Sequence, residues 1–174
     1  MTTILLDGSQ ANATQLAKTL SANQAVKLIV FYGHGLPDRL LGHKCKNLKP
    51  DAVVAKNGTG VVPEELAERN LYSFACLAGR KLARSLKGVN CGFIGYTEEV
   101  FTLDAFDAQY ESIVNGAASQ WAEGTPKEQV LKNLKTAWKN MARDYRYGGS
   151  GFEVDQSVLA AACALHLHDC VCSN

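Results

Sequence analysis

The strongest constraint on the fold is a set of short apolar runs that alternate with segments of helical periodicity. Three runs have the length and composition of buried strands: residues 27–32 (KLIVFY), 71–75 (LYSFA) and 91–96 (CGFIGY). Around them, apolar residues recur three and four positions apart, as over residues 10–21. Strands that alternate with helices favour a parallel sheet, so the sequence predicts an α/β fold with a mainly parallel sheet flanked by helices.

Shorter patterns complete this expectation. Further short strands are expected at residues 3–7, 52–56 (as an edge strand or hairpin) and 166–174. Further helices are expected at residues 77–87, 103–121, 125–145 and 154–165, with one helical turn after Pro63. The helix over 77–87 should begin immediately after Cys76, and Thr125 and Glu128 have the spacing of a capping box.

Length and composition favour one domain, residues 1–174, large enough to bury its own core. The net charge of +1 gives no general argument for a nucleic acid or an anionic membrane as partner, and we predict neither. The amino-terminal residues lack the pattern of a secretory signal, and no run approaches the roughly 18 apolar residues of a membrane span. We therefore expect a cytoplasmic protein whose six cysteines are reduced.

Two reactive side chains follow neighbouring strands of the predicted sheet. His34 comes just after the run 27–32, and Cys76 just after the run 71–75. Because the carboxyl ends of parallel strands meet at one edge of a sheet, these residues could form a cysteine nucleophile and its histidine base. The backbone N–H groups of Gly35 and Cys76 would then stabilise the oxyanion. The alternative is a small core cysteine and a histidine that caps a loop.

The ordered set YGHG, SFAC and FIGYTEE resembles the caspase-like cysteine peptidases, and is most similar to their bacterial CHAT branch, which is related to separase. The resemblance covers roughly residues 27–140. It implies a caspase-like three-layer sandwich and a His34 and Cys76 dyad that cleaves peptide bonds through a thioester. It also implies a role in bacterial immunity or regulated proteolysis, under the control of an activating protein partner. The competing interpretation is a catalytically idle domain of this fold that binds a protein.

Substrate specificity depends on residues near the two strand ends. Phe74 stands where caspases carry Gln and metacaspases and legumains carry an acid, so it supplies no charge to the S1 pocket. In separase and several CHAT proteases an acid follows an aromatic residue at the end of the next strand. By this resemblance Tyr96 lies beside the pocket, and Glu98 would bind a basic P1 side chain. The alternative is a solvated pair of Glu98 and Glu99 in a loop.

Three other features receive simpler interpretations. The sequence HLHDCVC contains potential zinc ligands, His166, His168, Cys170 and Cys172, but a strand would place all four in a row on one face. We predict a terminal strand there, with no metal and no other cofactor. The basic residues Lys132, Lys135, Lys139 and Arg143 are interpreted as a solvated helix face. His43 and Cys45 are an alternative base and thiol that nothing in the sequence positions.

Overall fold

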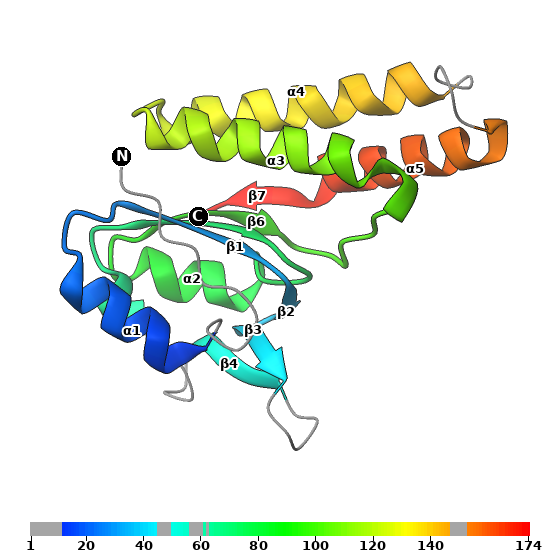
Figure 1. The fold of residues 1–174 in the computed structure, drawn as a ribbon. Coiled ribbons are helices and arrows are strands. Elements are labelled where there is room, and N and C mark those ends of the chain that lie inside the picture. The colour runs from blue at the N-terminus through cyan, green and yellow to red at the C-terminus, as the bar shows by residue number, and fades with distance from the viewer. Residues whose placement is uncertain (1–11, 45–49, 56–60, 62, 147–152) are drawn as a thin grey trace. The chain divides into compact units, whose positions relative to one another are not determined.

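The structure is a computed structural model that describes residues 12–44, 50–55, 61, 63–146 and 153–174 (Figure 1). The chain forms two compact units, residues 1–99 with 172–174, and residues 100–171. The described residues contain five α-helices, a four-stranded, mainly parallel sheet and a three-stranded antiparallel sheet. The predicted α/β class with a mainly parallel sheet is therefore confirmed, whereas the single domain over residues 1–174 stays a prediction.

The first unit holds every strand of both sheets, apart from one residue of the last strand. Its elements are α1 (Ala13–Ala22), β1 (Leu28–Tyr32), β2 (His34–Leu36), β3 (Arg39–Lys44), β4 (Pro50–Ala55), a 3-10 helix (Pro63–Leu66), β5 (Asn70–Phe74), α2 (Lys81–Lys87), β6 (Gly92–Tyr96) and β7 (Val171–Ser173). The larger sheet has the order β1-β5-β6-β7. The three apolar runs that the sequence marked as strands are its β1, β5 and β6, and the strand predicted at 3–7 lies outside the described residues.

The core of this unit lies against one face of the larger sheet, where Figure 1 shows α1 and α2. Leu16 and Leu20 of α1 are four residues apart and buried, as are Leu82 and Leu86 of α2. Both pairs join Phe93 of β6 in one cluster. Burying a leucine side chain contributes about 1.5–3 kcal/mol, so this apolar stripe, more than helix propensity, holds the short α2 in place.

The antiparallel sheet has the order β2-β3-β4 and follows directly from β1. A turn at Pro37 and Asp38 joins β2 to β3, and Asp38 forms an ion pair with Arg39 at 2.9 Å. The expected strand or hairpin at 52–56 is confirmed as β4. The sequence analysis missed β2 and β3, because this stretch is polar and lacks the alternation of a half-buried strand.

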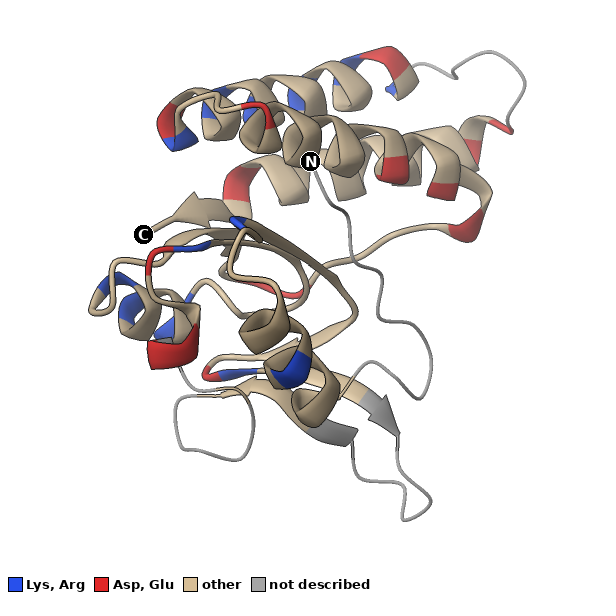
Figure 2. Cartoon of the chain, turned by 60° about the vertical axis from the view of Figure 1, so that its left-hand side comes forward, with Lys and Arg blue, Asp and Glu red and all other residues tan. Residues whose placement is uncertain are grey.

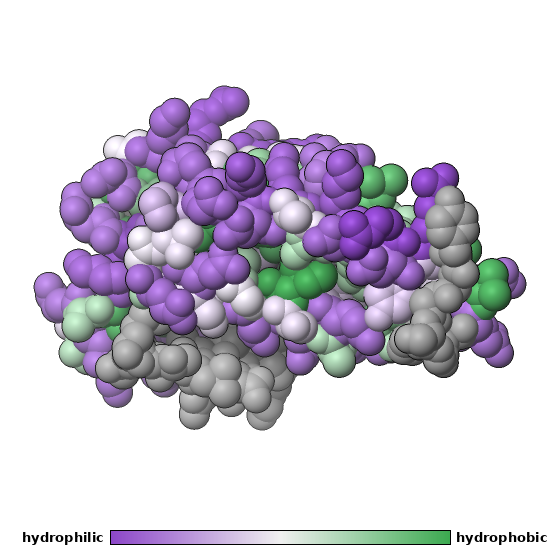
Figure 3. All heavy atoms as spheres, turned by 90° about the horizontal axis from the view of Figure 1, so that it is seen from above, coloured by the Kyte–Doolittle hydropathy of each residue, from purple (hydrophilic) through white to green (hydrophobic). Residues whose placement is uncertain are grey.

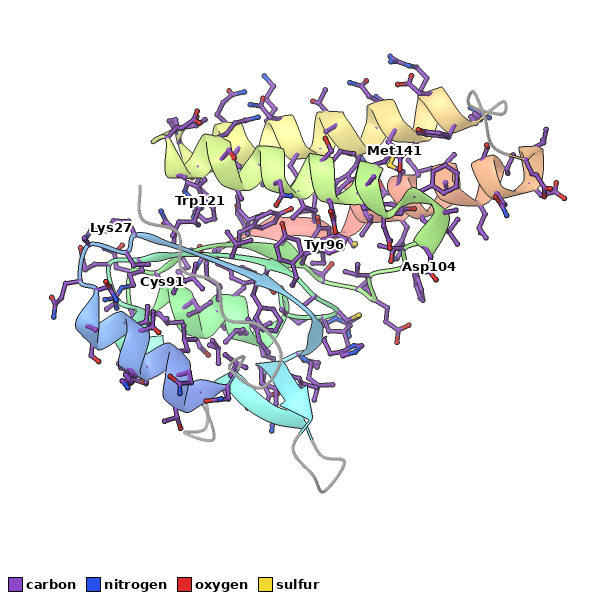
Figure 4. The ribbon with its side chains drawn as sticks, in the orientation of Figure 1. Lys27, Cys91, Tyr96, Asp104, Trp121 and Met141 are labelled. Carbon is purple, nitrogen blue, oxygen red and sulfur yellow. The ribbon has the colours of Figure 1, made fainter. Side chains whose placement is uncertain are left out.

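The second unit is helical. It contains a 3-10 helix (Asp104–Phe106), α3 (Asp107–Ala122), α4 (Lys127–Tyr145) and α5 (Val154–Cys170). Apolar residues of α3 and α4 are buried, among them Trp121 and Met141, which Figure 4 labels. The predicted capping box is wrong: Pro126 is the N-cap of α4, and no side chain caps it.

The carboxyl-terminal strand is shorter than predicted. Residues 166–170, assigned to that strand from the sequence, are the last turns of α5, and only Val171–Ser173 form β7. Alternating polar and apolar residues in HLHDC suggested a strand, but Leu167 and Cys170, three apart, are buried as on one face of a helix. None of the described helices is both long and apolar enough to cross a membrane.

Candidate functional site

The ends of β1 and β5 lie side by side and bring the segments of His34 and Cys76 together. In the parallel register Tyr32 is opposite Phe74, and the Gly33 N–H donates to the Phe74 carbonyl oxygen at 3.4 Å. Two residues further on, a Cβ atom at Gly35 would overlap the carbonyl oxygen of Cys76 and lie 3.0 Å from the Ala75 Cβ. The backbone around His34 is therefore packed against the backbone around Cys76, as the sequence predicted.

Both side chains of the predicted dyad are accessible. His34 is exposed and begins β2, where it pairs with Leu41 of β3. Cys76 is half-buried, is not part of a disulfide and lies directly beyond β5. Gly35 is buried, and its closest neighbour on Cys76 is the carbonyl oxygen. The oxyanion role of the Gly35 and Cys76 N–H groups stays a prediction.

The helix expected immediately after Cys76 does not begin there. Residues 77–80 form a turn in which Leu77 has a left-handed φ of 61°, and α2 begins at Lys81. The N–H groups of Lys81 and Leu82 donate to the Pro37 carbonyl oxygen at 2.8 and 2.9 Å. The prediction is wrong because tertiary hydrogen bonds keep residues 77–80 in a turn instead of a helix. The first N–H groups of α2 are directed at the β2–β3 turn rather than at Cys76.

The turn after Cys76 is fastened to the segment that follows β6. Leu77 N–H donates to the Glu98 carbonyl oxygen at 2.9 Å, and Gly79 N–H donates to the Tyr96 carbonyl oxygen at 2.8 Å. On its other side, Gly79 approaches Cys172 of β7, whose Sγ lies 3.9 Å from the Gly79 carbonyl oxygen. A Cβ at Gly79 would lie 2.5 Å from that sulfur. This role of Cys172 could not be predicted from the sequence, since it depends on where β7 joins the sheet.

Glu98, the predicted S1 acid, is half exposed and pairs with Arg80. Its Oε2 accepts a hydrogen bond from Arg80 Nη2 at 2.6 Å, and both side chains are about half exposed, 51% for Glu98 and 47% for Arg80. Arg80 Nε also donates to the Thr97 carbonyl oxygen at 2.6 Å. Sequence reasoning missed Arg80, because its partner is fixed by the turn at 77–80 and not by spacing along the chain.

Phe74 and Tyr96 belong to an aromatic cluster at the ends of β1, β5 and β6. The rings of Phe74 and Tyr96 meet edge to face with centroids 5.4 Å apart, and Phe74 lies 6.4 Å from the ring of Tyr32. Tyr96, labelled in Figure 4, is buried, and its hydroxyl lies 3.5 Å from that of Tyr72. The cluster packs the strand ends together and presents rings and hydroxyls rather than charge.

The possible zinc ligands of the HLHDCVC segment are separated by the end of α5. The ring centroids of His166 and Phe101 are 5.6 Å apart, and His168 Nδ1 lies 2.8 Å from an Asp169 carboxylate oxygen. Among the described residues, no three His, Cys, Asp or Glu side chains are grouped closely enough to hold a metal ion. The alternative base and thiol, His43 and Cys45, lie outside the description: the structure describes only the backbone of His43 and does not describe Cys45.

Comparison with known proteins adds no relative: no family model, no curated protein and no solved structure matches this chain. The residues at the ends of β1, β5 and β6 are therefore the basis for a functional proposal.

Proposed function

We propose that this chain is a cysteine endopeptidase of the caspase-like three-layer fold, with Cys76 as nucleophile and His34 as general base and acid. The observation that supports it is the register of β1 and β5. It places the two residues at equivalent positions beyond adjacent parallel strands, with Gly35 against the Cys76 backbone. Opposed positions at the carboxyl edge of a parallel sheet are where catalytic groups from different strands converge.

The chemistry follows from these two groups. His34 accepts the thiol proton of Cys76, and the sulfur attacks the carbonyl carbon of the scissile peptide bond. The tetrahedral intermediate collapses when His34 returns the proton to the leaving amine, which leaves a thioester on Cys76. Water, deprotonated by His34, then attacks the thioester and releases the acid product. The N–H groups of Gly35 and Cys76 are the proposed donors to the oxyanion.

Glu98 remains the proposed acid that selects a basic P1 residue, with one added condition. A P1 arginine has to take the place of Arg80 or share the carboxylate with it. Exchange is feasible because an ion pair this exposed contributes only about 0–1 kcal/mol. Protein or peptide substrates with Arg or Lys at P1 are therefore the proposed class.

Control by an activating protein partner is also proposed, because α2 gives Cys76 no helix-dipole support in this arrangement. A partner that reshapes the turn at 77–80 would change the surroundings of the thiol. The five cysteines among the described residues form no disulfide, as expected for the proposed reducing, cytoplasmic location. Regulated proteolysis, as in bacterial defence, is the setting that the family resemblance suggests.

The second candidate is an idle domain of the same fold that binds a protein partner. The Arg80–Glu98 pair favours it, since the carboxylate proposed for substrate already has an internal partner. The two candidates differ in the reactivity of Cys76, which an idle domain does not require.

The deciding test compares the alkylation of Cys76 with that of Cys172, a second half-buried cysteine of the same unit that is not in a disulfide. With iodoacetamide near neutral pH, we expect Cys76 to react at least about tenfold faster, because a histidine base raises the thiolate fraction. His34→Gln should bring the two rates together, as followed by mass spectrometry of the labelled peptides. Equal rates in the unmodified chain, or a fast Cys76 in His34→Gln, would contradict the dyad.

A peptide library gives the matching test of activity. We expect Cys76→Ala to abolish cleavage, whereas Cys172→Ala retains it. Glu98→Gln should reduce the preference for Arg over uncharged P1 residues by about tenfold, since a charge-assisted hydrogen bond is lost. Equal cleavage after Asp, Asn and Arg would remove Glu98 from the S1 pocket while leaving the dyad in place.

A further inference from the structure

In the second unit the positively charged side chains are concentrated on one helix, α4. Residues 100–171 carry nine Asp and Glu residues but six Lys and Arg residues, and all six lie on α4 or at Arg146, which ends it. In Figure 2 the blue of this unit is confined to α4, whereas red marks α3 and α5 as well. A solvated helix face usually mixes the two signs at intervals of three or four residues. A predominantly acidic unit with its cations on one helix has the charge pattern of an anion-binding site.

Part of this basic helix lines a groove. The groove has a volume of about 420 Å³, which lies in the range of small-molecule sites. From α4 it is lined by Glu128, Leu131, Lys132, Lys135, Thr136 and Lys139, and from α5 by His168. The α4 positions recur at intervals of three and four, so they share one face of the helix. The surface over α3 and α4 in Figure 3 is mostly hydrophilic.

No ion pair within the described part of the chain includes the three lysines of the groove, although the carboxylate of Glu128 also lines it. The ion pairs there join Asp38 to Arg39, Arg80 to Glu98, Arg143 to Asp144 and His168 to Asp169, and none includes Lys132, Lys135 or Lys139. Lys135 is half-buried, so its stem lies along the helix surface and its ammonium group reaches the groove. Asp169 holds the Nδ1 side of the His168 ring at 2.8 Å.

We propose that the groove formed by Lys132, Lys135, Lys139 and His168 binds a small anion that carries two or three phosphate groups. Lysine is a common ligand of phosphate, acting as a point charge with three donors. Lys132 and Lys139 are seven residues apart on α4, or about 10 Å along the axis, with Lys135 between them. Three ammonium groups over that length suit a short chain of phosphates better than a single one.

A small anion is a better match than a nucleic acid. The chain carries a net charge of only +1, and α3 and α5 present acidic residues beside the basic helix. A polynucleotide that extended beyond the groove would meet further carboxylates, whereas a ligand confined to the groove would face three lysines against the one carboxylate that lines it, Glu128. This site belongs to residues 100–171 and does not depend on the peptidase proposed for the first unit.

The test is calorimetric titration of the full chain with sodium tripolyphosphate at low ionic strength. We expect saturable binding with one site per chain. Lys135→Gln should weaken it about tenfold, since a hydrogen bond to a charged group is lost. Arg143→Gln is the matched control, because it removes the same charge from the same helix at a residue outside the groove that already pairs with Asp144. Circular dichroism of each variant verifies that the helices are intact.

Nuclear magnetic resonance of the same titration provides a second measurement that does not need a variant. We expect the largest shift changes at the amides of residues 131–139 and at the His168 ring. Equal weakening by Lys135→Gln and Arg143→Gln would overturn the site, as would shift changes outside the groove or no saturation at millimolar ligand. A single-stranded oligonucleotide that bound more tightly than tripolyphosphate would also overturn it, in favour of a nucleic acid.

Discussion

At Gly35 the lack of a side chain is what allows the segments of His34 and Cys76 to touch. The Cys76 carbonyl oxygen occupies the place where a Cβ atom would be, and the Ala75 Cβ lies 3.0 Å from it. Both neighbours are part of a strand end or of its side-chain packing, so neither can move aside like a flexible side chain. A larger residue at this position has to push β2 away from β5.

We therefore expect Gly35→Ala to lower the free energy of unfolding by about 1–3 kcal/mol, the usual cost of overpacking. It should also slow alkylation of Cys76, because the contact between the two strand ends is lost. Urea unfolding followed by circular dichroism measures the first effect, and iodoacetamide labelling measures the second.

Gly116 in α3 provides the control. A Cβ there would meet no atom within 4 Å, so Gly116→Ala should raise the stability by about 0.5–1 kcal/mol through helix propensity. If Gly35→Ala were as well tolerated as Gly116→Ala, the close packing of the two strand ends would be wrong.

Among the elements, β7 is held by the residue that follows it. The Asn174 side chain accepts a hydrogen bond from Phe93 N–H at 2.9 Å and donates to the Cys91 carbonyl oxygen at 2.7 Å and to that of Ala83 at 3.3 Å. Its own N–H donates to the Phe93 carbonyl oxygen at 3.3 Å. One side chain thus joins β7 to the start of β6 and to the first turn of α2.

Asn174→Ala should lower the free energy of unfolding by about 1–3 kcal/mol, since it leaves partly buried backbone groups without their side-chain partner. Asn174→Asp should be more damaging at neutral pH, because its carboxylate would face two carbonyl oxygens. Ser173→Ala, one residue earlier in β7, is the matched control and should change the stability little. Chemical denaturation of the three variants measures these differences. An Asn174→Asp chain with an unchanged free energy of unfolding would contradict the hydrogen-bond assignment.

The same elements show what the sequence could predict. β1, β5 and β6 were predictable because each is a compact apolar run, and the neighbouring positions of His34 and Cys76 followed from their parallel order. The turn at 77–80 was not predictable, since LAGRKLARSLK has helical spacing throughout. Its first residues are kept out of α2 by tertiary hydrogen bonds, among them those of Leu77 to Glu98 and of Gly79 to Tyr96. The Arg80–Glu98 pair depends on that turn, so it could not be predicted from the sequence either.

At the scale of the whole molecule, each of the two units buries a tyrosine whose pKa is raised. In the first unit, burial and then the neighbouring Tyr96 raise the pKa of Tyr72 well above its ordinary value. In the second unit, burial and then the neighbouring Cys163 raise the pKa of Tyr110. The chain has only two tryptophans, Trp121 and Trp138, and both belong to the second unit, so tryptophan fluorescence reports on that unit.

These tyrosines predict that both units lose stability in alkaline solution. A tyrosine with a raised folded-state pKa contributes its full stability below the unfolded value, near 10, where both states keep the proton. Above that pH the unfolded chain ionises while the folded core retains the proton, so the free energy of unfolding falls by about 1.4 kcal/mol per pH unit for each group. The loss continues up to the folded-state pKa of each tyrosine.

We expect the urea midpoint to fall steeply from about pH 10 upward. Tyr110→Phe should flatten this dependence in tryptophan fluorescence, and Tyr72→Phe should flatten it in far-ultraviolet circular dichroism, which reports on both units. Tyr32→Phe is the control, because Tyr32 is 46% exposed and is the smallest of the causes that raise the pKa of Tyr72, so its replacement should change the slope only slightly. A urea midpoint independent of pH across this range would show that the buried tyrosines do not govern alkaline stability. The same conclusion would follow if Tyr32→Phe flattened the pH dependence of the midpoint as much as Tyr72→Phe.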